Sequence, residues 1–168
     1  MLKKIAILAG LLAMAFGVMM VTSGDRAFEV RNDLIIDRPA AQIWTVMTDV
    51  GKWREWWPGV QEARLTDTWR RGATLDLVLK GTPEERPARV ETVVAERELV
   101  WKRPGILGSV TRTSILLEPV PGGTRISLVS FIEGPQAVLA GFTGREAFDR
   151  YHEAVLAALE GRLKQGGG

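Results

Sequence analysis

Hydrophobic residues recur along the chain with two different periods, and these periods separate strands from helices. Between residues 26 and 36, the apolar side chains of Phe28, Val30, Leu34 and Ile36 recur at even positions and charged ones at most of the odd positions between them, as in a strand with one buried face. Similar short runs follow later in the chain and predict further strands. They cover residues 60–67, 73–80, 88–95, 98–102, 109–118 and 124–133.

Helical segments flank these strands. Residues 39–49 carry an apolar face, with Asp37 as the expected N-cap, and a short second helical turn covers residues 52–56. Near the other end, apolar residues recur every three to four positions between residues 144 and 164, which predicts a long amphipathic helix. The terminal residues 166–168 are all glycine and are expected to be disordered.

The order of these elements predicts the class of fold. Loops 81–87, 103–108 and 119–123 are rich in Gly and Pro, as expected of connections between antiparallel neighbours. We therefore expect an α+β fold, with a curved antiparallel sheet of about seven strands wrapped around the long C-terminal helix and two short helices after the first strand. A long helix laid across such a sheet encloses a hollow.

The N-terminal segment has the character of a targeting or anchoring sequence. Lys3 and Lys4 precede an uncharged run of 17 residues, Ile5 to Val21, which as a helix would span roughly 25 Å. Residues 1–25 are therefore predicted to be a membrane anchor or a cleaved signal peptide, and residues 26–165 the folded domain. With the lysines on the inner side, the domain lies outside the cytoplasm, anchored in the inner membrane or secreted into the periplasm of the cell envelope.

Composition and charge exclude several classes of function. The 168 residues are 46% hydrophobic, and 22 basic against 20 acidic residues leave a net charge of +2. Nucleic-acid binding requires a concentrated basic surface, so we expect no nucleic-acid partner. With no Cys and one His, the chain excludes disulfides, thiolate nucleophiles and zinc sites built on Cys or several His. We expect no metal ion and no other cofactor, and the sequence carries no signature of oligomeric state.

Three stretches resemble one known family. The sequence DRPAAQIWTVMTD at 37–49, followed by WREWWPGV at 53–60, resembles the opening of the polyketide cyclase/dehydrase and START-related (SRPBCC) superfamily. Residues 99–101 and the turn at 118–126 resemble its middle and its late hairpin. The similarity extends from residue 26 to about residue 164. It implies the helix-grip fold, with a pocket between sheet and C-terminal helix for lipids, sterols, polyketides or other bulky apolar ligands.

Strand alternation and the expected position of the long helix assign the pocket walls. The tryptophans at 53, 56 and 57 either close one end of the fold or form the mouth of the pocket. We expect the ligand-binding residues to be Trp53, Trp57, Leu75, Leu77, Leu79, Trp101, Thr113, Ile115, Ile126, Leu128, Ser130, Phe148 and His152.

Two residues are candidates for catalysis. His152 is the one side chain whose unperturbed pKa lies near neutral pH, and it is either a general acid/base or a histidine at the boundary of the core. Arg112 points outward if Thr111 and Thr113 point inward; in the opposite arrangement it anchors an anion in the pocket.

The primary functional hypothesis is binding or carriage of a hydrophobic small molecule, such as a lipid, an isoprenoid or a polyketide-like compound. The membrane is a second partner through residues 5–21 if this segment is retained. Two alternatives stay open. One is an enzyme of the polyketide cyclase/dehydratase type, in which His152 or Arg112 polarises a carbonyl. The other is a non-catalytic domain at the membrane surface, with exposed tryptophans and a hollow filled by side chains.

Overall fold

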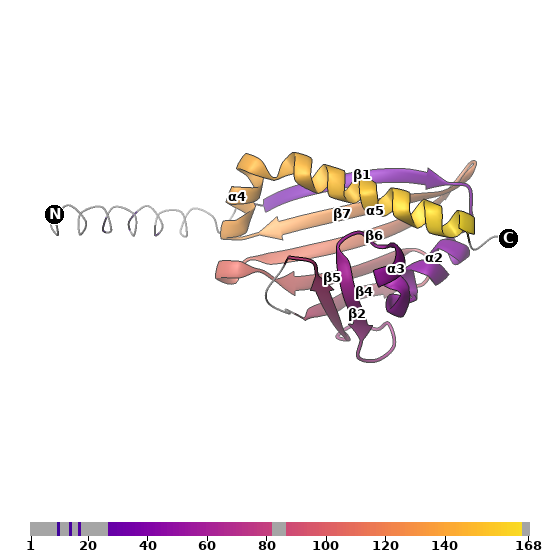
Figure 1. The fold of residues 1–168 in the computed structure, drawn as a ribbon, viewed down its shortest axis with the longest axis horizontal. Coiled ribbons are helices and arrows are strands. Elements are labelled where there is room, and N and C mark those ends of the chain that lie inside the picture. Colours follow the sequence, from indigo (N-terminus) through magenta and orange to yellow (C-terminus); the bar gives the residue numbers. More distant parts are fainter. Residues whose placement is uncertain (1–9, 11–13, 15–16, 18–26, 82–86, 166–168) are drawn as a thin grey trace.

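The computed structural model has one antiparallel sheet of seven strands with helices on its concave side (Figure 1). It describes residues 10, 14, 17, 27–81 and 87–165, so nearly all of the predicted N-terminal segment and the glycine tail lie outside the described residues. In the described part of the chain, no helix is both long and apolar enough to cross a membrane. The elements are β1 (Ala27–Ile36), α2 (Ala40–Thr48), η1 (Val50–Lys52), α3 (Trp53–Trp56), β2 (Val60–Leu65), β3 (Thr74–Leu79), β4 (Ala88–Val94), β5 (Glu98–Pro104), η2 (Ile106–Gly108), β6 (Val110–Val120), β7 (Gly123–Glu133), α4 (Pro135–Thr143) and α5 (Arg145–Gln165).

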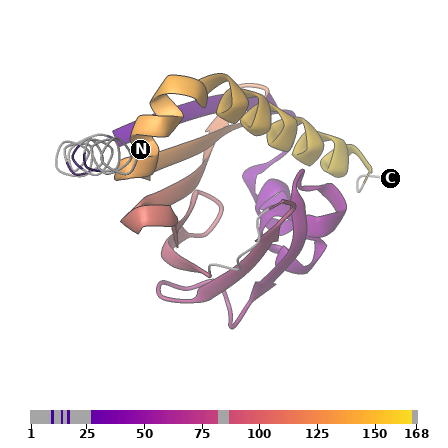
Figure 2. The same cartoon turned by 60° about the vertical axis from the view of Figure 1, so that its left-hand side comes forward.

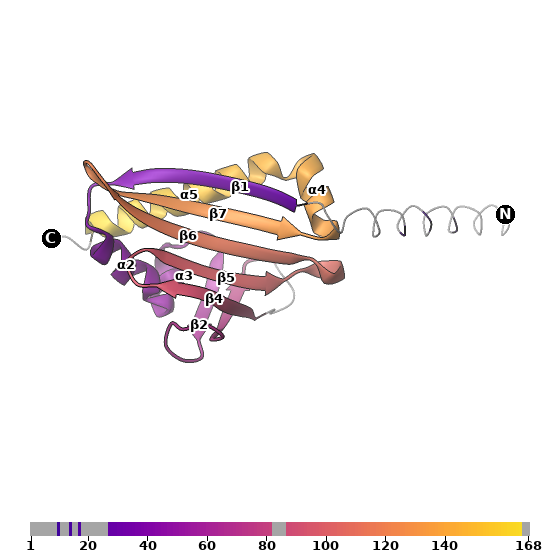
Figure 3. The same cartoon turned by 180° about the vertical axis from the view of Figure 1, so that it is seen from behind.

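The strands follow the order β1-β7-β6-β5-β4-β3-β2. Strands β2 to β7 therefore form a meander, and β1 joins it at the edge by pairing with β7. The sheet curls, and α5 lies across its concave side (Figure 2). From behind, strands β1 and β7 pass in front of α5 (Figure 3). The predicted α+β helix-grip architecture is confirmed.

The spacing of apolar residues explains how these elements face the core. In β1, Phe28 and Val30 are buried while the alternating Glu29 and Arg31 are exposed. In α5 the buried residues recur at intervals of one, three and four, which keeps one helix face against the sheet. These residues are His152, Val155, Leu156, Leu159 and Leu163.

Gly144 separates the two C-terminal helices. A Cβ atom at this position would lie 2.8 Å from the backbone oxygen of Ala140, so any larger residue would force the backbone to shift. The chain can therefore turn from α4 into α5 only over a residue without a side chain, and α5 begins directly after this glycine.

Two local predictions are wrong. Asp37 does not cap the first helix, which begins after Pro39 without a side-chain hydrogen bond at its N-cap. Strand β5 does not end at Lys102, because pairing with β6 continues through Arg103 and Pro104. Pro104 and Gly105 predicted a loop from residue 103, but the connection to β6 begins only at Gly105. This extension places the Arg103 side chain on a sheet face.

Candidate functional site

A cavity of about 320 Å³ lies between the sheet and α5. Strands β3, β5, β6 and β7 form its walls, and the first turns of α5 cover it. Its volume falls at the lower end of the roughly 300–1,000 Å³ typical of small-molecule sites. The lining residues are Trp57, Leu77, Leu79, Trp101, Arg103, Thr111, Thr113, Leu128, Ser130, Ala147, Phe148, Tyr151 and His152.

The cavity has a buried floor and a rim that is open to solvent. The five floor residues are at most 6% exposed. The rim side chains are half-buried or exposed, and Tyr151 is 37% exposed. A ligand can therefore contact water at the rim while its other end is enclosed. The floor consists of Trp57, Trp101, Leu128, Ser130 and His152.

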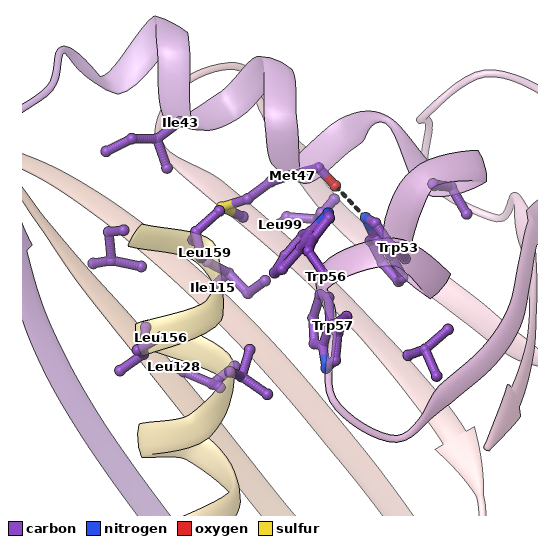
Figure 4. Close-up of a cluster of buried hydrophobic side chains, with 14 of the residues drawn as sticks. Ile43, Met47, Trp53, Trp56, Trp57, Leu99, Ile115, Leu128, Leu156 and Leu159 are labelled. Carbon is purple, nitrogen blue, oxygen red and sulfur yellow. Dashed lines mark hydrogen bonds between the residues drawn. The ribbon is translucent and has the colours of Figure 1, made fainter. Parts of the chain in front are cut away.

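Tryptophans cluster in the core beside the cavity, with their rings tilted against one another (Figure 4). Trp53 is fully buried, and its indole N–H donates a hydrogen bond of 2.8 Å to the backbone oxygen of Met47. The ring centroid of Trp57 lies 4.6 Å from that of Trp53, and that of Trp101 lies 5.8 Å from it. Trp53 and Trp56 thus close the end of the fold, whereas Trp57 and Trp101 also form the cavity floor.

The burial of these tryptophans argues against the alternative of a non-catalytic domain that binds the membrane surface through exposed tryptophans. Trp53 and Trp57 are 0% and 6% exposed, so neither presents an indole to a bilayer or a partner protein. The hollow under α5 is also not filled by side chains. The predicted exposed aromatic surface at these two positions is therefore wrong, because their rings pack against one another and against the core.

His152 is fully buried at the centre of a polar network on the cavity floor. Its Nδ1 lies 2.9 Å from Asn32 Oδ1, and its Nε2 lies 2.8 Å from Ser130 Oγ. Since an amide oxygen only accepts hydrogen bonds, Nδ1 carries the proton and Nε2 accepts the Ser130 hydroxyl hydrogen. Burial lowers the pKa of His152, which keeps the ring neutral at pH 7.

The order of hydroxyl, imidazole and amide is that of a nucleophile, a base and an orienting group. However, Ser130 lies on a central strand that is paired with both β1 and β6. Its backbone N–H is therefore used in the sheet and is not available to stabilise an oxyanion. The network fixes the orientation and charge of His152 and provides one acid/base group at the cavity.

The structure brings nine of the thirteen predicted ligand-binding residues to the cavity and places the other four in the core. Leu75, Ile115 and Ile126 have the predicted inward orientation, and with Trp53 they belong to a buried core cluster that includes residues of α2, α3 and α5. These four residues are not among those that line the cavity. The nine at the cavity are Trp57, Leu77, Leu79, Trp101, Thr113, Leu128, Ser130, Phe148 and His152, and their ligand contacts stay a prediction.

Arg103, Ala147 and Tyr151 line the cavity but were not identified as site residues from the sequence, whereas Thr111 was expected to point inward. The sequence predicted that this strand ends at residue 102, so Arg103 was assigned to a loop. In the longer strand β5, alternation places Arg103 on the same face as the inward-facing Trp101. Tyr151 receives a hydrogen bond of 2.9 Å from the indole N–H of Trp57, a contact between residues that are 94 positions apart.

Arg112 does not lie at the cavity, which corrects the alternative in which it anchors an anion there. It faces the outer side of the sheet, where its Nε donates a hydrogen bond of 2.6 Å to Glu91. Lys102 pairs with the same carboxylate at 3.0 Å. The Arg112 hydrogen bond is the main reason why the pKa of Glu91 is below its ordinary value. Within the described residues, no three His, Asp or Glu side chains gather as a metal site requires.

Solved structures share this fold at low sequence identity. A protein of Nitrosomonas europaea is 21% identical with a TM-score of 0.66, and the match covers 83% of this chain and 96% of that one. The ZhuI aromatase/cyclase of a Streptomyces species is 18% identical with a TM-score of 0.64, covering 84% and 99%. The two-domain aromatase/cyclase StfQ of the steffimycin pathway is 12% identical with a TM-score of 0.69, covering 88% and 54%.

Family membership is shown by the sequence itself. No curated protein matches the chain. The family model described as polyketide cyclase / dehydrase and lipid transport matches residues 27–164, which is almost the whole described domain. The chain belongs to this polyketide cyclase/dehydrase and lipid transport family.

Proposed function

We propose that the protein binds or carries a hydrophobic small molecule in the cavity under α5. The observation that supports this most directly is the cavity itself, about 320 Å³ with an apolar lining, enclosed at one end and open at the other. Family membership and the fold shared with aromatase/cyclases support the same class of ligand: a lipid, an isoprenoid or a polyketide-like compound.

The test is to look for a bound molecule and then for stabilisation. The purified full-length chain is expected to release an apolar compound on solvent extraction, detected by mass spectrometry. After extraction, a matching ligand at about 100 times its dissociation constant is expected to stabilise the fold by about 2.7 kcal/mol, a rise of roughly 5 °C or more in melting temperature. If no compound is extracted and no lipid, isoprenoid alcohol or aromatic polyketide raises the melting temperature, the proposal is wrong.

We also propose that the domain works in the cell envelope. The support is the sequence of residues 1–25, in which two lysines precede an uncharged run of 17 residues. The extraction is therefore made separately on the membrane fraction and the soluble envelope fraction. Recovery of the protein only from the cytoplasmic fraction would contradict this location.

A second candidate function is catalysis of the polyketide cyclase/dehydratase type, favoured by the Ser130–His152 hydrogen bond at the cavity floor. A neutral imidazole that accepts from a hydroxyl can relay a proton taken from carbon next to a carbonyl. The Ser130→Ala variant is then expected to lose at least about 100-fold in kcat for cyclisation of a poly-β-keto thioester, with KM nearly unchanged. Equal turnover in this variant would exclude the relay.

A further inference from the structure

We infer that the ligand of this cavity is an amphiphile with an anionic head group, which Arg103 and Tyr151 hold at the rim while the apolar body lies on the tryptophan floor. This inference rests on the proposed binding function and makes it more specific. It begins with the position of Arg103, which follows Trp101 by two residues on β5 and therefore points to the same concave side.

The strand presents two neighbouring basic residues to opposite environments. On the outer face, Lys102 and Arg112 share the carboxylate of Glu91. On the inner face, Arg103 has no carboxylate within ion-pair distance and makes no side-chain hydrogen bond to any residue that the structure describes. The two outer cations thus have a carboxylate partner, whereas the cation at the cavity has none among the described residues.

Burial makes this cation costly without a partner. Withdrawal from water lowers the pKa of Arg103, but a guanidinium remains charged at any physiological pH. A cation that is partly withdrawn from water is stabilised by an anionic group, such as a carboxylate or phosphate, whose oxygens accept its hydrogen bonds. Among the residues that the structure describes, no acidic side chain fills this role, and an anionic group of the ligand would fill it.

Two hydroxyl groups complete a site for an anion. Tyr151 Oη accepts a hydrogen bond from Trp57 Nε1, so its own O–H is available to donate toward the cavity. Burial raises the pKa of Tyr151, which keeps that proton in place at neutral pH. Thr111 lies directly opposite Arg103 in the β5–β6 register and also lines the cavity. A carboxylate or phosphate can accept from the guanidinium fork and a hydroxyl together.

The positions of floor and rim orient the molecule. Arg103, Thr111 and Tyr151 lie at the accessible rim, whereas Trp57, Trp101 and Leu128 enclose the other end. A ligand bound in this way has its charge near water and its hydrocarbon or aromatic body beneath α5. A single-chain carboxylic acid meets these requirements, and a phosphate monoester offers the same head-group chemistry.

The test compares ligands that differ only in the head group. Dodecanoate, dodecyl phosphate and dodecanol are titrated into the extracted full-length protein by isothermal titration calorimetry. Wild-type protein is expected to bind at least one of the two anions about tenfold or more tightly than dodecanol, and the preferred anion identifies the head group. Arg103→Met is expected to abolish the difference, and Arg103→Lys to restore part of it.

Arg112→Met is the matched control, since it removes a guanidinium from the outer face of the same sheet region. It is expected to retain the full preference for the anion. If dodecanol binds to the wild type as tightly as both anions, or if Arg103→Met keeps the preference, the head-group inference is wrong while hydrophobic binding stands. If none of the three ligands binds, the inference is wrong, and the extraction and melting-temperature test above decides separately on the proposed function. Far-ultraviolet circular dichroism confirms that each variant is folded.

Discussion

Replacing Trp53 by Ala is expected to lower the free energy of unfolding by about 3–5 kcal/mol, a large fraction of the roughly 5–15 kcal/mol that keeps a typical domain folded. Trp53 is fully buried, and its ring contacts those of Trp57, Trp69 and Trp101. Its removal would leave a void at the point where α2, α3 and the sheet meet. It would also leave the backbone oxygen of Met47 without its indole donor.

Urea unfolding followed by circular dichroism measures this change. Trp53→Phe is the control, because it keeps an aromatic ring but removes the N–H group. Its expected cost is smaller, about 1–2 kcal/mol, from the lost hydrogen bond and the reduced volume. A Trp53→Ala variant less than about 1 kcal/mol below wild type would show that the tryptophan cluster does not stabilise this end of the fold.

Thr113→Phe is expected to reduce the affinity for apolar ligands by at least about 100-fold, or about 2.7 kcal/mol. Thr113 lies in the middle of the cavity wall, between Trp101 on one neighbouring strand and Ser130 on the other. A phenyl ring at this position would occupy the space that a ligand needs. Because that space is empty in the protein, the free energy of unfolding should change by less than about 1.5 kcal/mol.

The adjacent residue provides the control. Ser114 lies on the opposite face of β6, so Ser114→Phe adds the same ring outside the cavity. Calorimetric titration with dodecanol should give wild-type affinity for Ser114→Phe and no measurable binding for Thr113→Phe. Wild-type affinity in both variants would mean that the ligand does not enter under α5.

The sequence predicted the architecture well because the period of apolar residues directly reports which face of an element is buried. Strand alternation also placed Leu77, Leu128 and Ser130 correctly on the concave side. Alternation does not show the distance between a helix and the sheet, which changes along the length of the helix. Ile115 and Ile126 therefore have the predicted orientation but lie where the helices close on the sheet, and they belong to the core.

The polar part of the site depends on contacts that a local pattern does not contain. Asn32 orients His152 across 120 positions of the sequence. Its even position places it on the inner face of the first strand, but alternation does not show which residue it meets there. Arg103 was missed for a local reason. The following Pro and Gly are typical of a loop, whereas tertiary pairing with β6 extends the strand through Pro104.

The tryptophan floor has an optical consequence. Trp57 and Trp101 face the cavity and also lie within 4.6 and 5.8 Å of the enclosed Trp53, measured between ring centroids. Indole emission depends on the polarity next to the ring, and excitation passes readily between indoles this close together. A guest that displaces water from two of these rings therefore changes the emission of the whole group, so the intrinsic fluorescence of the protein reports occupancy without any attached dye.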